Sequence, residues 1–186
     1  ATERGVIVVN TPSGNATTTA EHAIAMLMSL SRHIPQADKS MNGGKWEKSK
    51  FTGIEVTGKV LGVFGYGNIG KIAADRAIGL KMRVMVFDPF LTAEIAAKNG
   101  VELVTKEKLF ERADYITVHV PLNDSTRNLI NKNTIETMKT GVRIINCARG
   151  GIVNESDLIE GLDSGKIAGA AIDVFEEEPP PQDNPL

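Results

Sequence analysis

The stretch Val60-Leu61-Gly62-Val63-Phe64-Gly65-Tyr66-Gly67-Asn68-Ile69-Gly70 decides the fold of this chain. A short apolar run, typical of a buried strand, leads into a Gly-x-Gly-x-x-Gly pattern that opens a helical segment. In that context Gly65 permits a tight turn, Gly67 lets the backbone approach a pyrophosphate, and Gly70 lets helix and strand pack closely. The N-terminus of the helix offers N–H groups and the positive end of its dipole to the phosphates. The stretch predicts a dinucleotide site, and the alternative is a structural glycine turn in an unrelated α/β protein.

Asp88 indicates which dinucleotide is bound. It ends the apolar segment 83–87, where a carboxylate accepts hydrogen bonds from ribose hydroxyls. The same carboxylate would repel a 2′-phosphate, and the following Pro89 and Phe90 supply no cation to hold one. NAD is therefore expected rather than NADP.

Strand and helix patterns alternate regularly outside this stretch. Strands are predicted at 60–64, 83–87, 101–104, 115–120, 142–146 and 168–174, and helices at 69–79, 92–99, 106–112, 133–137 and 155–162. Because the strands are apolar without alternation, they form a parallel sheet that is covered on both faces. The fold class is α/β, a doubly wound and mostly parallel sheet of Rossmann type with its ligand at the carboxyl ends of the strands. Residues 1–186 are expected to form one dinucleotide-binding domain.

The N-terminal part adds two elements. The apolar residues 6–9 read as a short buried strand that ends at Asn10-Thr11-Pro12. The helix expected from Thr19 to about Arg32 is apolar nearly all round, so it is buried on most sides, in a subunit interface or in an ordinary core. The first residues do not look like a natural start, and we expect a fragment of a longer protein.

Composition excludes several classes of function. The 186 residues carry a net charge of -2, which gives no electrostatic reason to expect a nucleic acid or an anionic membrane as partner. The longest apolar run, 23–28, is too short to cross a bilayer. Cys147 is the single cysteine, so an intrachain disulfide and a cysteine-rich metal site are excluded, and no His/Asp/Glu spacing indicates a metal. A cytoplasmic protein is expected.

Candidate chemistry lies at the predicted strand ends. Arg149 follows the strand 142–146 and could grip a substrate carboxylate, or it could be a surface arginine. Cys147 is expected to pack rather than to act as a nucleophile, since no histidine lies near it in sequence. The run 176–178 could orient a histidine through a carboxylate, although glutamate runs are usually solvated. His119 is expected to be a strand-end histidine with its hydrogen bonds satisfied.

Four ordered motifs resemble those of the D-isomer-specific 2-hydroxyacid dehydrogenases. They are Gly65-Tyr66-Gly67-Asn68-Ile69-Gly70, Val118-His119-Val120-Pro121-Leu122, Asn146-Cys147-Ala148-Arg149-Gly150-Gly151-Ile152-Val153 and Ala171-Ile172-Asp173-Val174-Phe175-Glu176-Glu177-Glu178-Pro179-Pro180. The resemblance covers essentially the whole chain. Asn10-Thr11-Pro12-Ser13-Gly14-Asn15, the helix start at Thr19 and Gly44-Lys45-Trp46 narrow it to the branch that oxidises 3-phosphoglycerate to 3-phosphohydroxypyruvate in L-serine biosynthesis.

The resemblance implies hydride transfer between C2 of a 2-hydroxy acid and the nicotinamide ring of NAD. Arg149 matches the arginine that holds and polarises the substrate, and Glu178 matches the glutamate that hydrogen-bonds the catalytic histidine. The other matches concern residues that contact NAD. Asn68 and Ile69 match residues whose backbone contacts the pyrophosphate, Asp88 matches the acid that binds the ribose, and Asp173 matches the acid near the nicotinamide carboxamide. The positions that line the cofactor cleft are matched by Val120, Pro121, Cys147, Ala148 and Arg149.

One departure from the family pattern concerns the catalytic histidine, which the resemblance leads us to expect beyond Leu186. The family's substrate-binding domain is expected from the segments before and after this chain. We therefore expect a cofactor domain that binds NAD with little turnover of its own. The resemblance implies a small-molecule substrate, 3-phosphoglycerate, and a homodimer or homotetramer that forms through this domain. The alternatives are a sister enzyme such as a glyoxylate or hydroxypyruvate reductase, and an NAD-sensing corepressor-like binding protein.

Overall fold

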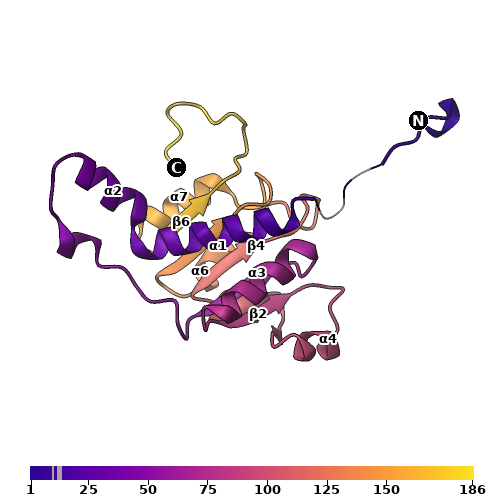
Figure 1. Ribbon diagram of the computed structural model, residues 1–186, viewed down its shortest axis with the longest axis horizontal. Helices are drawn as coiled ribbons and strands as arrows, with labels where there is room; N and C mark the ends of the chain where they lie inside the picture. Colours follow the sequence, from indigo (N-terminus) through magenta and orange to yellow (C-terminus); the bar gives the residue numbers. More distant parts are fainter. Residues whose placement is uncertain (10, 12–13) are drawn as a thin grey trace.

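The chain folds around one six-stranded sheet, with helices packed around it in Figure 1. The computed structural model describes residues 1–9, 11 and 14–186. All strand pairs are parallel, in the order β3-β2-β1-β4-β5-β6. The strands are β1 (Val60–Phe64), β2 (Arg83–Phe87), β3 (Glu102–Leu103), β4 (Tyr115–Val118), β5 (Val142–Asn146) and β6 (Ile167–Ile172). The predicted doubly wound Rossmann-type sheet is confirmed, and its order reverses between β1 and β4, where such sheets place their ligand.

Helices cover both faces of the sheet and create two apolar cores. They are α1 (Ala16–Arg32), α2 (Ile34–Asn42), α3 (Asn68–Gly79), α4 (Ala93–Lys98), α5 (Lys106–Arg112), α6 (Lys132–Thr137) and α7 (Glu155–Asp163), with two 3₁₀ turns at Thr2–Arg4 and Lys48–Phe51. One core joins α1, α3 and α4 to the sheet, and the other joins α5, α6 and α7. Because every residue of β1 and β4 is buried, both faces of these strands need apolar side chains, which is the pattern in their sequences.

Helix α1 crosses one face of the sheet beside α3 (Figure 1). Its fully buried positions, Ala20, Ala23 and Leu27, recur at helical spacing and form one stripe, while Ala25 is exposed. The helix starts earlier than predicted and is less buried than an all-round apolar sequence suggested, because it lies on a surface and not inside the domain. Ser31 anchors it: the Ser31 hydroxyl donates to the Leu27 carbonyl (2.7 Å) and lies 2.8 Å from the Tyr115 hydroxyl.

The prediction of a strand at residues 6–9 is wrong. These residues form no strand, and Val6, Ile7, Val8 and Val9 are 57%, 87%, 76% and 83% exposed. A β-branched run becomes a strand only where another strand satisfies its backbone groups, and this segment stands away from the sheet in Figure 1. Asn10, Pro12 and Ser13 of the predicted turn and motif lie outside the described residues. Within the described ranges, no helix is long and apolar enough to span a membrane.

Candidate functional site

The loop between β1 and α3, together with the first turn of α3, has three glycines in three different environments. Gly65 has a φ of +88°, and a Cβ there would lie 2.6 Å from the carbonyl oxygen of His119. A Cβ on Gly70 would overlap the carbonyl oxygen of Gly65, so α3 can approach β1 only with glycine here. A Cβ on Gly67 would meet no atom of the described residues within 4 Å. Gly65 and Gly70 are therefore required by the fold, whereas the bare backbone at Gly67 borders open space.

Asp88 lies directly after β2 and holds the glycine loop. Its Oδ2 accepts from the backbone N–H of Tyr66 at 2.6 Å, and its Oδ1 accepts from the N–H of Phe90 at 2.8 Å. A carboxylate oxygen has two acceptor positions, so each oxygen can still take a ribose hydroxyl. The sequence predicted a binding role for this residue, and the structure adds a second task, which is to position the loop.

A groove of about 1110 Å³ opens beside these residues, and we call it the β1–β4 groove. It runs over the carboxyl ends of β1, β2, β3 and β4, and its size suits a nucleoside-sized ligand or larger. The groove lining includes Gly65, Gly67, Asp88, Val120 and Pro121 of the predicted site. Sequence reasoning gave no binding role to several other lining residues, among them Phe90, Leu103, Val104, Lys106, Lys108 and Thr126.

Phe90 is the most informative of these lining residues. It is 90% exposed at the groove, which is unusual for a phenylalanine and offers a flat apolar surface to a ligand ring. Lys106 and Lys108, at the start of α5, bring positive charge to the same groove. Their distance along the chain from Asp88 explains why the local sequence around Asp88 did not reveal them.

His119 follows β4 and is only half satisfied. Its Nε2 lies 3.0 Å from the Thr117 hydroxyl, whereas the buried Nδ1 has no hydrogen-bond partner among the described residues. Burial lowers the pKa of His119 from 6.5 to about 4, so the ring is neutral near pH 7. The expectation of a fully satisfied histidine is therefore wrong for Nδ1, which is buried without a hydrogen-bond partner in the described part of the chain.

Asn146 shapes the loop that carries Arg149. This buried side chain donates from Nδ2 to the Arg149 carbonyl (3.0 Å) and accepts at Oδ1 from the Ala148 N–H (3.0 Å). The Arg149 side chain is exposed, and its Nη1 donates to the Ala148 carbonyl at 2.6 Å. Asn146 thus positions the Arg149 loop, a role that sequence reasoning did not assign to it. Its place as a polar residue at the end of an apolar strand could have indicated this role, because buried polar side chains are hydrogen-bonded.

The loops after β5 and β6 pack against each other, and we call residues 147–151 and 173–178 the β5–β6 loops. A Cβ on Gly150 would overlap the carbonyl group of Phe175, which shows how closely the two backbones approach. Glu178 is exposed, and its Oε1 accepts from the Phe175 N–H at 3.1 Å. Glu176 exchanges backbone-to-carboxylate hydrogen bonds with Glu155 at the start of α7. Glu176 therefore joins its loop to the start of α7. Glu178 instead contacts Phe175, whose carbonyl group packs against Gly150 of the Arg149 loop.

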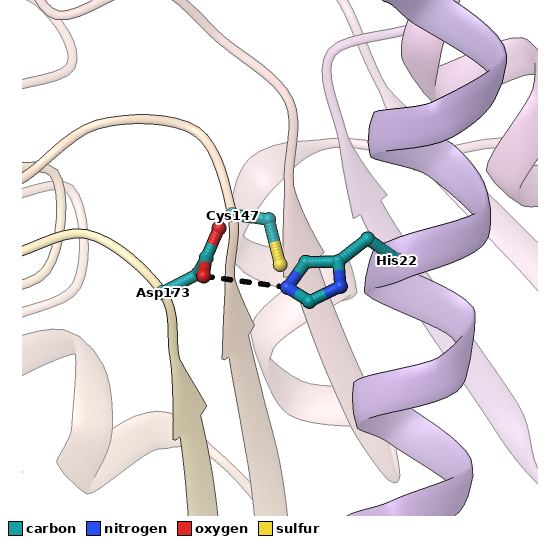
Figure 2. Close-up of side chains that lie close together, drawn as sticks. All are labelled: His22, Cys147 and Asp173. Atoms are coloured by element: carbon teal, nitrogen blue, oxygen red, sulfur yellow. Dashed lines mark ion pairs between the residues drawn. The ribbon is translucent and has the colours of Figure 1, made fainter.

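Cys147 and Asp173 meet His22 of α1 in this second region (Figure 2). The Nε2 of His22 lies 3.3 Å from Oδ1 of Asp173. The Cys147 thiol is buried, 3.4 Å from the Met26 sulfur, and burial together with the Asp173 charge raises its pKa to about 12. The thiol is packed and protonated at neutral pH, in agreement with the sequence expectation that Cys147 is not an activated nucleophile.

The predicted site residues therefore lie along one edge of the sheet in two groups. Gly65, Gly67, Asp88, Val120 and Pro121 line the β1–β4 groove. Cys147, Ala148, Arg149, Asp173 and Glu178 belong to the β5–β6 loops. Asn68, Ile69 and Gly70 form the first turn of α3 between the groups, where the positive end of a helix dipole favours an anion. The arrangement can hold an extended anionic ligand across the edge, and the binding roles of these residues stay predictions.

Comparison with known proteins shows relatives over the whole chain. The model of the family "D-isomer specific 2-hydroxyacid dehydrogenase, NAD binding domain" matches residues 24–186. D-3-phosphoglycerate dehydrogenase of Archaeoglobus fulgidus is 52% identical over 186 residues, 100% of this chain and 35% of that protein. D-3-phosphoglycerate dehydrogenase of Bacillus subtilis is 54% identical over 180 residues, which are 97% of this chain and 34% of that protein.

A solved structure, D-lactate dehydrogenase with NAD+ from Lactobacillus jensenii, superposes with a TM-score of 0.84 at 29% identity, covering 95% of this chain and 53% of that one. The chain spans about a third of the length of the curated relatives that it matches.

Proposed function

This chain belongs to the D-isomer-specific 2-hydroxyacid dehydrogenase family, and from that membership we propose that it binds NAD within an enzyme that oxidises 3-phosphoglycerate to 3-phosphohydroxypyruvate in L-serine biosynthesis. The two D-3-phosphoglycerate dehydrogenases named above support the substrate, since each shares about half of its aligned residues with this chain. The observation that carries the cofactor proposal is Gly67, whose backbone faces open space between two glycines that the fold requires.

The cofactor lies across the carboxyl edge of the sheet in this proposal. The adenosine half occupies the β1–β4 groove, with its ribose on Asp88 and its ring near Phe90. The pyrophosphate sits at Gly67, Asn68 and Ile69, on the N-terminus of the 12-residue helix α3. The nicotinamide half extends over the β5–β6 loops toward Cys147, Ala148 and Asp173. Asp88 favours NAD over NADP, because its carboxylate would repel a 2′-phosphate.

Two residues of the β5–β6 loops act on the substrate in this proposal. NAD, when bound, accepts the hydride that leaves C2 of the hydroxy acid. Arg149 binds the substrate carboxylate with its exposed guanidinium and withdraws electron density from the developing carbonyl. Glu178 orients the histidine that takes the hydroxyl proton, and its acceptor oxygens suit that task.

The cofactor proposal is tested by titrating the 186-residue chain with NADH and monitoring binding through the fluorescence of NADH. Gly67→Ala adds a methyl group that the fold accommodates, since no atom of the described residues lies within 4 Å, but that a pyrophosphate would meet. We expect its NADH affinity to fall at least tenfold, about 1.4 kcal/mol, with an unchanged melting temperature. Gly79→Ala, at the other end of α3 and equally open, is the matched control and should bind as the parent does. Equal NADH affinity in Gly67→Ala and the parent would contradict the placement.

The substrate proposal needs the longer protein that contains this chain. NADH oxidation is compared with 3-phosphohydroxypyruvate, glyoxylate and pyruvate as acceptors. A higher kcat/KM for the phosphorylated acceptor is expected, and a preference for glyoxylate or pyruvate would move the chain to a sister branch of the family. Activity with none of them would favour a binding protein.

Self-association through α1 is part of the same proposal. Its partly buried apolar residues Ile24, Met26 and Met28 pack against the core with part of their surface, and Leu30 is also only partly buried. The apolar surface that these side chains leave exposed is available to a second chain. Light scattering should show a dimer or tetramer, and a monomer at high concentration would remove this part of the proposal.

A further inference from the structure

Three potential metal ligands from three separate elements converge beside α1. His22 comes from α1, Cys147 follows β5 and Asp173 follows β6, and Figure 2 shows the three side chains pointing toward one another. The ligand atoms of the imidazole, the thiol and the carboxylate all lie within 4.8 Å of one another. Met26, one helical turn after His22, places its sulfur 3.4 Å from the Cys147 thiol. A sulfur, a nitrogen and an oxygen therefore lie close together, and a second sulfur lies beside the thiol.

We propose that His22, Cys147 and Asp173 form a binding site for a thiophilic divalent cation of the Zn²⁺ class. Zn²⁺ takes Cys, His and Asp ligands at about 2.0–2.3 Å, so its tetrahedral ligand atoms lie roughly 3.3–3.8 Å apart. The His22 to Asp173 distance of 3.3 Å already meets that spacing. Three protein ligands leave a fourth position, which a water or the Met26 thioether fills.

Binding replaces the proton of the Cys147 thiol with the cation. The S–H bond breaks, the sulfur–metal bond forms, and the proton passes to solvent, so no oxidant or reductant is needed. The thiolate, the carboxylate and the neutral imidazole then give the cation two negative charges and one neutral ligand. This combination favours Zn²⁺, Cd²⁺ or Co²⁺ over Mg²⁺ and Ca²⁺, which prefer oxygen ligands alone.

The site is open on one side and closed on the other. The side chains of His22 and Asp173 are 49% and 50% exposed, so a cation reaches them from solvent. Cys147 is only 6% exposed and forms the floor. A bound cation would tie α1 to the carboxyl ends of β5 and β6, which are joined to it here by packing and the His22–Asp173 pair.

The cation and the cofactor would compete for Cys147 and Asp173. This consequence rests on the proposed function, in which both residues contact the nicotinamide half of NAD. Metal binding itself does not depend on the cofactor and can be measured without it. A site that binds metal but leaves NADH affinity unchanged would leave the cation site standing and contradict the placement of the nicotinamide.

The direct test titrates the untagged, reduced 186-residue chain with Co²⁺ and records the thiolate-to-cobalt charge-transfer band and the visible bands of tetrahedral cobalt. We expect both in the parent chain, with displacement by Zn²⁺ and none by Mg²⁺. His22→Gln should weaken Co²⁺ binding by more than the roughly 10–100-fold that loss of an outer-sphere partner costs. Cys147→Ser should abolish the charge-transfer band.

The matched control is His33→Asn, which removes a histidine at the end of the same helix. His33 has a φ of 53°, a left-handed conformation that asparagine tolerates, and it lies outside the cluster. It should bind Co²⁺ as the parent does. The absence of a charge-transfer band in the folded parent, or equal Co²⁺ affinity in His22→Gln and the parent, would overturn the proposal.

Discussion

The β1–β4 groove and the β5–β6 loops lie on the same edge of the same sheet but are built differently. Backbone dominates the first: Gly65 is required by its φ and its neighbours, Gly67 faces open space, and Asp88 holds the loop through the Tyr66 N–H. Side chains dominate the second. Arg149 and Glu178 are exposed, and the loop around Arg149 depends on the Asn146 amide.

The difference separates what each region can tolerate. A Cβ on Gly65 or Gly70 would clash with backbone carbonyl groups, so substitution at these two positions changes the fold and the ligand site together. Gly67 borders open space, so substitution there changes the ligand site alone. The β5–β6 loops are held by a few hydrogen bonds, so their geometry can change while the sheet remains intact.

The largest effect is expected at Gly70 in the first region. Gly70→Ala places a methyl group on the Gly65 carbonyl, and α3 must move away from β1. We expect a loss of more than about 3 kcal/mol in the free energy of unfolding, the top of the usual range for overpacking. Gly79→Ala, in open space on the same helix, should change stability by less than about 0.5 kcal/mol. Urea denaturation of both variants measures the difference, and equal midpoints would show that α3 adapts.

The next effect is a pH dependence that comes from His119. Its pKa is about 4 in the folded chain and 6.5 as an ordinary histidine, so between these values the unfolded state binds more protons. Stability therefore falls as the pH drops from about 6.5 to 4, by at most about 3 kcal/mol. His119→Gln cannot take up this proton and should show a smaller loss over the same range. Identical pH profiles for the two chains would contradict the buried neutral ring.

Asn146→Ala tests the second region. It removes both hydrogen bonds that hold the Arg149 loop and leaves the Ala148 N–H without its partner, at a cost of about 2 kcal/mol. AMP, which reaches only the β1–β4 groove in our proposal, should bind with unchanged affinity, while NADH should bind more weakly. Calorimetric titration with the two ligands separates the regions, and an equal loss for both would show that they are one unit.

The smallest effect is expected for Asp88→Asn. The amide keeps one acceptor oxygen but loses the charge, so it gives up either the Tyr66 or the Phe90 contact and weakens any ribose bond. AMP and NADH affinities should fall together by about tenfold, equivalent to about 1.4 kcal/mol. NADPH should lose less, because the repelling charge is gone. A loss confined to NADH would place Asp88 outside the adenosine site.

Local patterns predicted most of the fold. The strands from 60–64 to 142–146 and the helices between them were readable because each alternation of apolar runs and breakers is complete within a few residues. Residues 6–9 show the limit of this reasoning. Their sequence is as β-branched and apolar as that of β1, yet they lie exposed, because a strand requires partners that its own sequence does not supply.

The sequence by itself determined the glycine loop, the acid after β2 and the order of the βαβ units, since these depend on interactions within about 30 residues. The tertiary structure alone decided the lysines that join the β1–β4 groove and the meeting of His22, Cys147 and Asp173. It also decided that Nδ1 of His119 has no hydrogen-bond partner among the residues that the structure describes. Those features join residues far apart in the chain, and only the crossing of α1 over the sheet brings the three ligands together. Sequence spacing carries no record of such a contact, because it arises from packing between elements.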